Sequence, residues 1–148
     1  ASLYIGSQLL TSPQPRLDLR LMVLALACAW LVDASAAATG TVRYAAAPLA
    51  WAPPPWIMAL WAAFAMTLTT SMRFLLRHRA LPALFGLLLA PLAYLSAARG
   101  FDAVRFAVPA WQGLLVLGAG WCIALSLLCH CARRGSRASS PPLAGVPS

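Results

Sequence analysis

The chain has 148 residues, of which 61% are hydrophobic and 9% are charged, and its formal net charge is +8. A soluble domain has about a quarter of its residues charged, so this composition excludes a water-soluble globular protein. The 11 basic residues are all arginines and fall between long apolar runs, unlike the basic patch of a nucleic-acid-binding protein. We therefore expect an all-α, polytopic transmembrane helical bundle with membrane lipids as partners and no nucleic acid.

Apolar segments follow one another along the chain. Residues 1–10, ASLYIGSQLL, are too short to span a bilayer and are interpreted as the end of a truncated transmembrane helix. Residues 11–131 are predicted to form one transmembrane bundle. Four runs in it are long enough to cross about 30 Å of hydrocarbon at about 1.5 Å per residue. Complete transmembrane helices are predicted at 21–38, 56–73, 81–98 and 108–131.

Prolines and polar residues set the predicted boundaries. Pro13 and Pro15 mark a loop before the helix at 21–38, and the prolines at 53–55 prevent regular helix before Trp56. Residues 132–148 are rich in serine, proline and small side chains, so they are predicted to form a disordered cytoplasmic tail.

The arginines predict the orientation. If the helices alternate in direction, eight of the 11 arginines share one side of the membrane. These are Arg16, Arg20, Arg73, Arg77, Arg79, Arg133, Arg134 and Arg137. The positive-inside rule therefore places the C-terminus in the cytoplasm. Trp51, Trp56 and Trp111 then lie near the outer interface, where indole rings prefer to sit.

Three segments carry a family resemblance. They are VDASAAATGTVRY at 32–44, LWAAFAMTLTTSMRFL at 60–75 and APLAYLSAARG at 90–100. Over about residues 16–134 the chain resembles the uncharacterised bacterial inner-membrane family catalogued as domain of unknown function 2878. The resemblance implies two further N-terminal helices, so that residues 1–10 end the second of six, and a location in the bacterial inner membrane.

The same resemblance implies no activity. Genes of the family often lie near those of fatty-acid-modifying methyltransferases, which links it to lipid modification by association. The chain departs from the family at Thr69 and Thr70, where the family's pattern has an Asn-His-like pair. Any role of that imidazole is therefore missing here.

Asp33 interrupts the apolar run at 21–38. It lies about 20 Å beyond Arg20 along the predicted helix, where a carboxylate is costly unless it is paired or faces water. We expect an intramembrane ion pair with Arg99. A proton or cation site at Asp33, or simple hydration near the surface, are the alternatives.

Three further clusters are candidate sites. Arg99, Asp102 and Arg105 align as an outer-interface charge cluster if RGFDAVR forms a short helix, and its arginines are alternatively lipid-phosphate anchors. A polar helix patch is expected to bond backbone carbonyls or a neighbouring helix, with a substrate path as the alternative. This patch consists of Thr67, Thr70 and Ser71. A small-residue stripe is expected to pack against another helix. It consists of Gly86, Ala90, Ala93 and Ala97.

Metal and cofactor sites are not predicted. His78, Cys129, His130 and Cys131 are the candidate ligands, and their spacing matches no standard structural zinc pattern. Haem would need two histidines on facing helices, whereas His78 and His130 lie in or beside loops. No catalytic triad or phosphate-binding glycine loop is present.

The sequence leaves three functions open. The leading interpretation is a non-catalytic accessory or scaffold subunit, with a membrane-protein partner or a second copy of the chain. A small transporter or lipid-handling protein using Asp33 and Arg99 is the first alternative. A membrane enzyme with a cytoplasmic-side site at His78 and residues 129–131 is the second. Transport predicts a water-accessible cavity that reaches Asp33.

Overall fold

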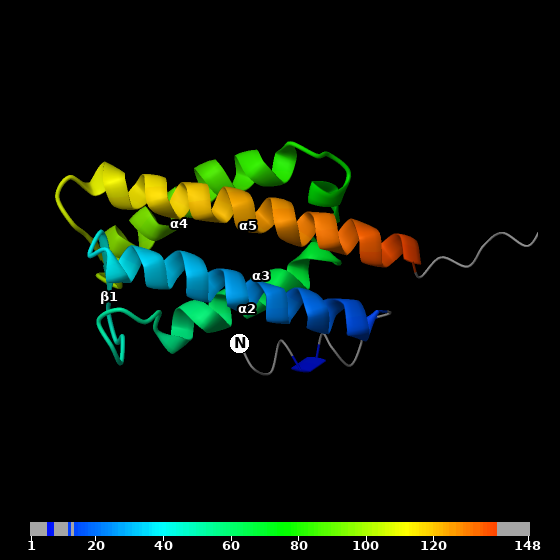
Figure 1. The fold of residues 1–148 in the computed structure, drawn as a ribbon, viewed down its shortest axis with the longest axis horizontal. Coiled ribbons are helices and arrows are strands. Elements are labelled where there is room, and N and C mark those ends of the chain that lie inside the picture. Colours follow the sequence, from blue (N-terminus) through cyan, green and yellow to red (C-terminus); the bar gives the residue numbers. More distant parts are fainter. Residues whose placement is uncertain (1–5, 8–11, 13, 139–148) are drawn as a thin grey trace, which may run out of the picture.

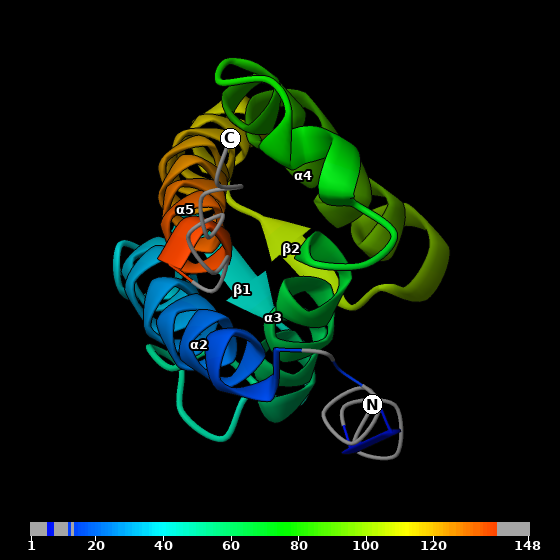
Figure 2. The ribbon, with the colours of Figure 1, turned by 90° about the vertical axis from the view of Figure 1, so that its right-hand side faces the viewer.

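The computed structural model describes residues 6–7, 12 and 14–138, and it is a helical bundle with a small β-ribbon at one end (Figures 1 and 2). Of the predicted stub at 1–10, only residues 6 and 7 lie within the described part. The elements in chain order are α2 (Pro15–Ala38), β1 (Val42–Tyr44), α3 (Pro55–Leu68), η1 (a 3₁₀ turn, Arg73–Leu76), α4 (Leu81–Phe101), β2 (Val104–Phe106) and α5 (Ala110–Ala138).

Three of the described helices are long and apolar enough to cross a membrane: α2, α4 and residues Ala110–Ser136 of α5. The fourth, α3, is apolar but has only 14 residues. The membrane bundle expected from composition is therefore present with three candidate spans and one shorter apolar helix.

The helices alternate in direction, as predicted. The start of α2, the turn η1 and the end of α5 lie at one end of the bundle, while β1 and β2 lie at the other (Figure 1). We call these the basic end and the ribbon end. The arginines near the start of α2, beside η1 and near the end of α5 therefore share the basic end.

Three helices extend several residues beyond their predicted limits, and one of them is α4, which ends at Phe101 instead of residue 98. α2 begins at Pro15 instead of residue 21, because proline is tolerated in a first helical turn, where its missing N–H has no partner to lose. α5 continues to Ala138 instead of ending at residue 131. Arg133 and Arg134 favour a helix C-terminus, so residues 132–138 are helical where a tail was predicted; residues 139–148 lie outside the described part.

α3 ends at Leu68 instead of residue 73. The hydroxyl of Thr67 donates to the carbonyl of Phe64 at 2.7 Å, and that of Thr70 donates to the carbonyl of Met66 at 3.1 Å. Such hydroxyls compete with the backbone for helical hydrogen bonds, so a cluster of them ends the helix early. The prediction that this patch bonds backbone carbonyls is confirmed for Thr67 and Thr70.

The β-ribbon was not predicted. β1 and β2 pair antiparallel, with Val42 opposite Phe106 and Tyr44 opposite Val104. Along each strand a buried valine, an exposed arginine and a half-buried aromatic residue alternate, which suits a strand with one covered face. The short helix that would align Arg99, Asp102 and Arg105 does not form: α4 ends at Phe101, and Asp102 follows in the left-handed conformation with φ of 48°.

Glycine allows α4 and α5 to approach closely. A Cβ at Gly86 would lie 2.5 Å from the carbonyl oxygen of Trp121, and one at Gly118 would lie 3.1 Å from that of Leu87. Within the predicted small-residue stripe, Gly86 and Ala90 are buried, Ala97 is half-buried and Ala93 is exposed. The stripe therefore packs α4 on α5 in its first half only.

We expect Gly86→Ala to destabilise the bundle by roughly 1–3 kcal/mol, because its methyl group would meet backbone that cannot move aside. Gly100→Ala is the matched control, since a Cβ there meets nothing within 4 Å. Thermal unfolding in mild detergent measures the difference. Equal melting temperatures for the two variants would contradict the close packing of α4 on α5.

Candidate functional site

Asp33 is fully buried near the ribbon end of α2 and accepts three hydrogen bonds. The hydroxyls of Tyr44 and Tyr94 donate to its Oδ1 at 2.7 and 2.5 Å. The indole Nε1 of Trp61 donates to its Oδ2 at 2.8 Å. The donors come from β1, α4 and α3, so one carboxylate of α2 connects three other elements.

The predicted ion pair between Asp33 and Arg99 is not formed. Arg99 is exposed, and the one salt bridge among the described residues joins Arg105 to Asp102. Tyr94 of α4 bonds the carboxylate instead. Tyr94 lies about two turns before the end of α4, at the depth of Asp33, whereas Arg99 lies nearer the surface. Neutral donors can hold a buried carboxylate when several converge on it.

Aromatic rings enclose the carboxylate. Trp121 of α5 stacks on Trp61 with ring centroids 3.7 Å apart, and its Nε1 lies 3.4 Å from the Tyr94 hydroxyl. Tyr44 meets Tyr94 edge to face at 6.4 Å. Burial, then the charge of Asp33, raise the pKa of Tyr44 well above its usual range, so its hydroxyl stays protonated and donates. We call these five residues the Asp33 hub.

Sequence reasoning found Asp33 but missed its partners. Tyr44 lies between the helices predicted at 21–38 and 56–73, while Trp61, Tyr94 and Trp121 lie within apolar runs that give them no distinct role. A signal did exist, since each is an aromatic side chain with one polar atom, and such residues need a partner when buried.

A second buried carboxylate lies at the basic end. Asp18, in the first turn of α2, is 3% exposed and accepts a hydrogen bond from the Thr69 hydroxyl at 2.8 Å. The Ser12 hydroxyl donates to its other oxygen. Asp18 lies before the predicted start of this helix at residue 21, so its burial is not predicted from the sequence. Its contact with Thr69 joins α2 to the segment that follows α3.

The outer-interface charge cluster is smaller than predicted. Arg105 donates to both carboxylate oxygens of Asp102 through Nε at 3.0 Å and Nη2 at 2.5 Å. These bonds, with the arginine's charge, lower the pKa of Asp102 below its usual value. Arg99 takes no part in the pair. Both partners are largely exposed, so the pair adds little to stability.

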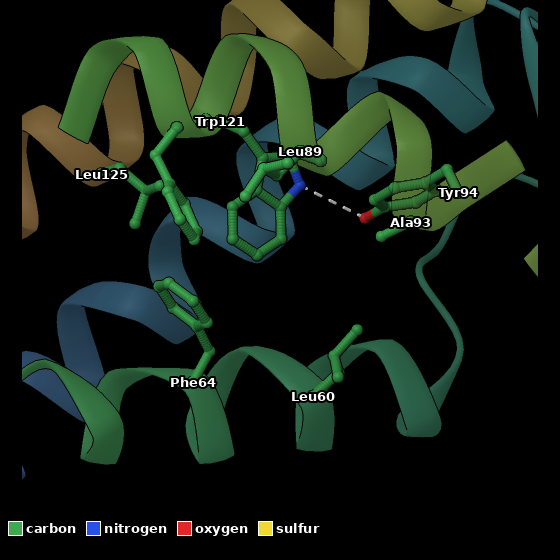
Figure 3. Close-up of a pocket in the computed structure, with 10 residues that line it drawn as sticks. Leu60, Phe64, Leu89, Ala93, Tyr94, Trp121 and Leu125 are labelled. Carbon is green, nitrogen blue, oxygen red and sulfur yellow. Dashed lines mark hydrogen bonds between the residues drawn. The ribbon is translucent and has the colours of Figure 1, made fainter. Parts of the chain in front are cut away.

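An apolar pocket lies between α3 and α4, with α5 at its back. α4 packs mainly on α5, and α3 packs mainly on α2, which leaves about 200 Å³ between them. Figure 3 shows Leu60 and Phe64 on α3 directed toward α4, and Trp121 beside them with its bond to Tyr94. We call it the α3–α4 pocket. Its lining consists of Leu60, Phe64, Phe85, Gly86, Leu89, Ala90, Ala93, Tyr94, Trp121 and Leu125.

The candidate metal ligands do not converge. Cys129 is buried in the bundle, while His78 and His130 are exposed. Among the residues that the structure describes, no three His, Cys, Asp or Glu side chains are placed to hold one ion. The four cysteines are free thiols.

Comparison with known families identifies the chain at the family level. Residues 1–127 match the family described as protein of unknown function (DUF2878). The chain belongs to this family. The resemblance inferred from the hydrophobic segments is therefore confirmed. No curated protein and no solved structure matches the chain.

We expect Asp33→Ala to cost roughly 2–5 kcal/mol of stability, because three buried donors lose their acceptor. Arg99→Ala should be close to neutral, since this arginine is exposed and unpaired with Asp33. Thermal unfolding of both variants in detergent tests the hub. A large loss in Arg99→Ala, matching that of Asp33→Ala, would restore the ion pair and contradict the hub.

Proposed function

We propose that this protein is a non-catalytic, multi-pass accessory protein of the bacterial inner membrane that binds the hydrocarbon chain of a membrane lipid in the α3–α4 pocket. The observation that carries the proposal is the pocket itself, an apolar recess within the membrane-embedded part of the bundle. The excess of arginines at the basic end supports a cytoplasmic C-terminus.

The size of the pocket favours a chain segment over a whole ligand. Sites for complete small molecules usually enclose about 300–1,000 Å³. An apolar cavity of about 150 Å³ can stay dry and bind benzene. At about 200 Å³ the α3–α4 pocket suits part of an acyl or isoprenoid chain.

The chemistry of the walls also favours hydrocarbon. Tyr94 and Trp121 are the lining residues with a polar side-chain atom. The Tyr94 hydroxyl donates to Asp33 and accepts from the Trp121 indole, so both polar atoms already have partners. An occupant is therefore held by shape and apolar contact. Both flanking helices are apolar, so an occupant would enter from the bilayer.

The environment of Asp33 favours a structural role over transport. Its carboxylate has no exposed surface and three hydrogen-bond donors, and it does not line the α3–α4 pocket. Transport predicts a water-accessible path to Asp33, and a side chain without exposed surface does not support one. The cytoplasmic-side enzyme is likewise disfavoured, because Cys129 is buried away from exposed His78.

A partner-docking role has separate support from α4. Of the 18-residue apolar stretch of α4 that could span the membrane, only 22% is buried within the bundle, compared with 39% for the stretches of α2 and α5. Its outward residues include Leu84, Leu88 and Leu92, each more than half exposed. A scaffold or accessory subunit would use this face of α4 to contact another membrane protein or a second copy.

To test the pocket, we would purify the protein in mild detergent with phosphatidylcholine and measure retained lipid by native mass spectrometry. Leu89→Trp should reduce lipid retention about fivefold or more, the effect of losing about 1 kcal/mol, because the indole fills the pocket. Leu88→Trp is the matched control, because Leu88 is exposed outside the pocket. Equal retention in the two variants would reject the pocket as a lipid site.

To test docking, a photo-crosslinking amino acid placed at Leu88 should give one discrete protein adduct in native membranes. The same group at Leu31, an exposed residue of α2, is the control. Adducts with lipid alone at both positions would reject a partner on α4.

A further inference from the structure

A basic cleft lies at the basic end, between α5 and the turn that precedes α4. It encloses about 430 Å³ and is separate from the α3–α4 pocket, with which it shares no residue. Three guanidinium groups and one imidazole line it together with one hydroxyl. Its residues are Arg79, Ser126, His130, Arg133 and Arg134.

No acidic side chain is left to pair with these cations. The chain contains only three acidic residues, and the structure assigns each of them elsewhere. Asp18 and Asp33 are buried with hydrogen-bond donors, and Asp102 is paired with Arg105 at the ribbon end. Three arginines held around one recess repel one another, so the cleft favours an anion from outside the chain.

The cleft is partly pre-organised. Nη1 of Arg133 lies 3.4 Å from the carbonyl oxygens of both Leu76 and His78, so it ties the turn before α4 to α5. Arg79 directly follows His78 in the chain and lines the cleft together with Arg134. Fixed guanidinium groups bind oxyanions more strongly than mobile ones, because less side-chain entropy is lost on binding.

The position of the cleft identifies the kind of anion. Ser126 and Arg134 are eight residues apart, so the cleft extends over about 12 Å, from within the membrane-spanning part of α5 to its end. Ile123 and Leu127 are exposed and share a helix face with His130 and Arg134 at i, i+4, i+7 and i+11. The cations lie toward the end of α5, where a phosphate headgroup would sit, and the apolar side chains lie deeper in the membrane-spanning part, where its acyl chain would run.

We propose that the basic cleft binds the phosphate of an anionic phospholipid at the membrane surface. The cleft contains no carboxylate that could contact an amine or a choline, so a headgroup with net negative charge is preferred over a zwitterionic one. Basic recesses between membrane helices on the cytoplasmic side commonly bind such headgroups. This site goes beyond the proposed chain-binding pocket and does not depend on it.

The test compares two charge-matched double variants. Arg79→Gln with Arg134→Gln removes two charges from the cleft, and Arg73→Gln with Arg77→Gln removes two exposed charges at the same end outside it. Arg133 is left unchanged because it also holds the turn. Retention of phosphatidylglycerol and of phosphatidylcholine is measured by native mass spectrometry in mild detergent.

The wild type should retain phosphatidylglycerol in preference to phosphatidylcholine. The cleft variant should lose this preference by about tenfold or more, while the control variant should keep it. An equal loss in both variants would overturn the proposal in favour of diffuse attraction to the basic end. Displacement of the lipid by millimolar inorganic phosphate alone would overturn it in favour of a free-phosphate site.

The Leu89→Trp variant separates this proposal from the chain-binding pocket. It should retain the phosphatidylglycerol preference, because Leu89 does not line the cleft. If the pocket test with phosphatidylcholine fails, the headgroup site in the basic cleft is not affected. If the test of the arginine double variants fails, the proposed lipid site in the α3–α4 pocket is not affected. Melting temperatures of all variants show that each is folded.

Discussion

The architecture depends on the cost of burying one carboxylate. Removing a charged carboxylate from water without partners is prohibitive, so Asp33 must be met by several donors. Those donors come from β1, α3 and α4, and Trp121 of α5 stacks on one of them. In a bilayer, apolar helix faces gain little by choosing one another over lipid. A polar centre to which each helix contributes supplies the specificity that apolar contact lacks.

The Asp33 hub joins the helices near the ribbon end, so other contacts must hold them together farther along the bundle. Asp18 and Thr69 hold α2 to the segment after α3 at the basic end. Gly86 and Gly118 allow close packing of α5 on the first half of α4. Within the part of the chain that the structure describes, no comparable contact draws α3 toward α4 away from the hub. The α3–α4 pocket is thus the place where two well-fixed helix pairs, α2 with α3 and α4 with α5, diverge.

The membrane-spanning helices could be predicted from sequence, because hydrophobicity and helix length are properties of single segments. Three of the four predicted spans are long and apolar enough to cross a membrane, and Asp33 stands out because it interrupts one of them. The prediction of a fourth complete span is not confirmed, because α3 has only 14 residues. The partners of Asp33 could not be predicted, since they depend on the depth and rotation of three other elements. The ribbon was missed because VRY and VRF are only three residues each. The early end of α3 was missed because local hydroxyl bonding outweighed an otherwise apolar run.

The shortness of α3 has a consequence for the surrounding bilayer. Fourteen residues of helix extend about 21 Å, roughly 9 Å less than a typical hydrocarbon core. Such a hydrophobic mismatch is relieved when the bilayer thins locally, at a cost of fractions of a kcal/mol per ångström. That cost is smallest for lipids with short or unsaturated chains. The lipids that contact α3 should therefore differ in composition from those of the bulk membrane, and these lipids lie next to the α3–α4 pocket.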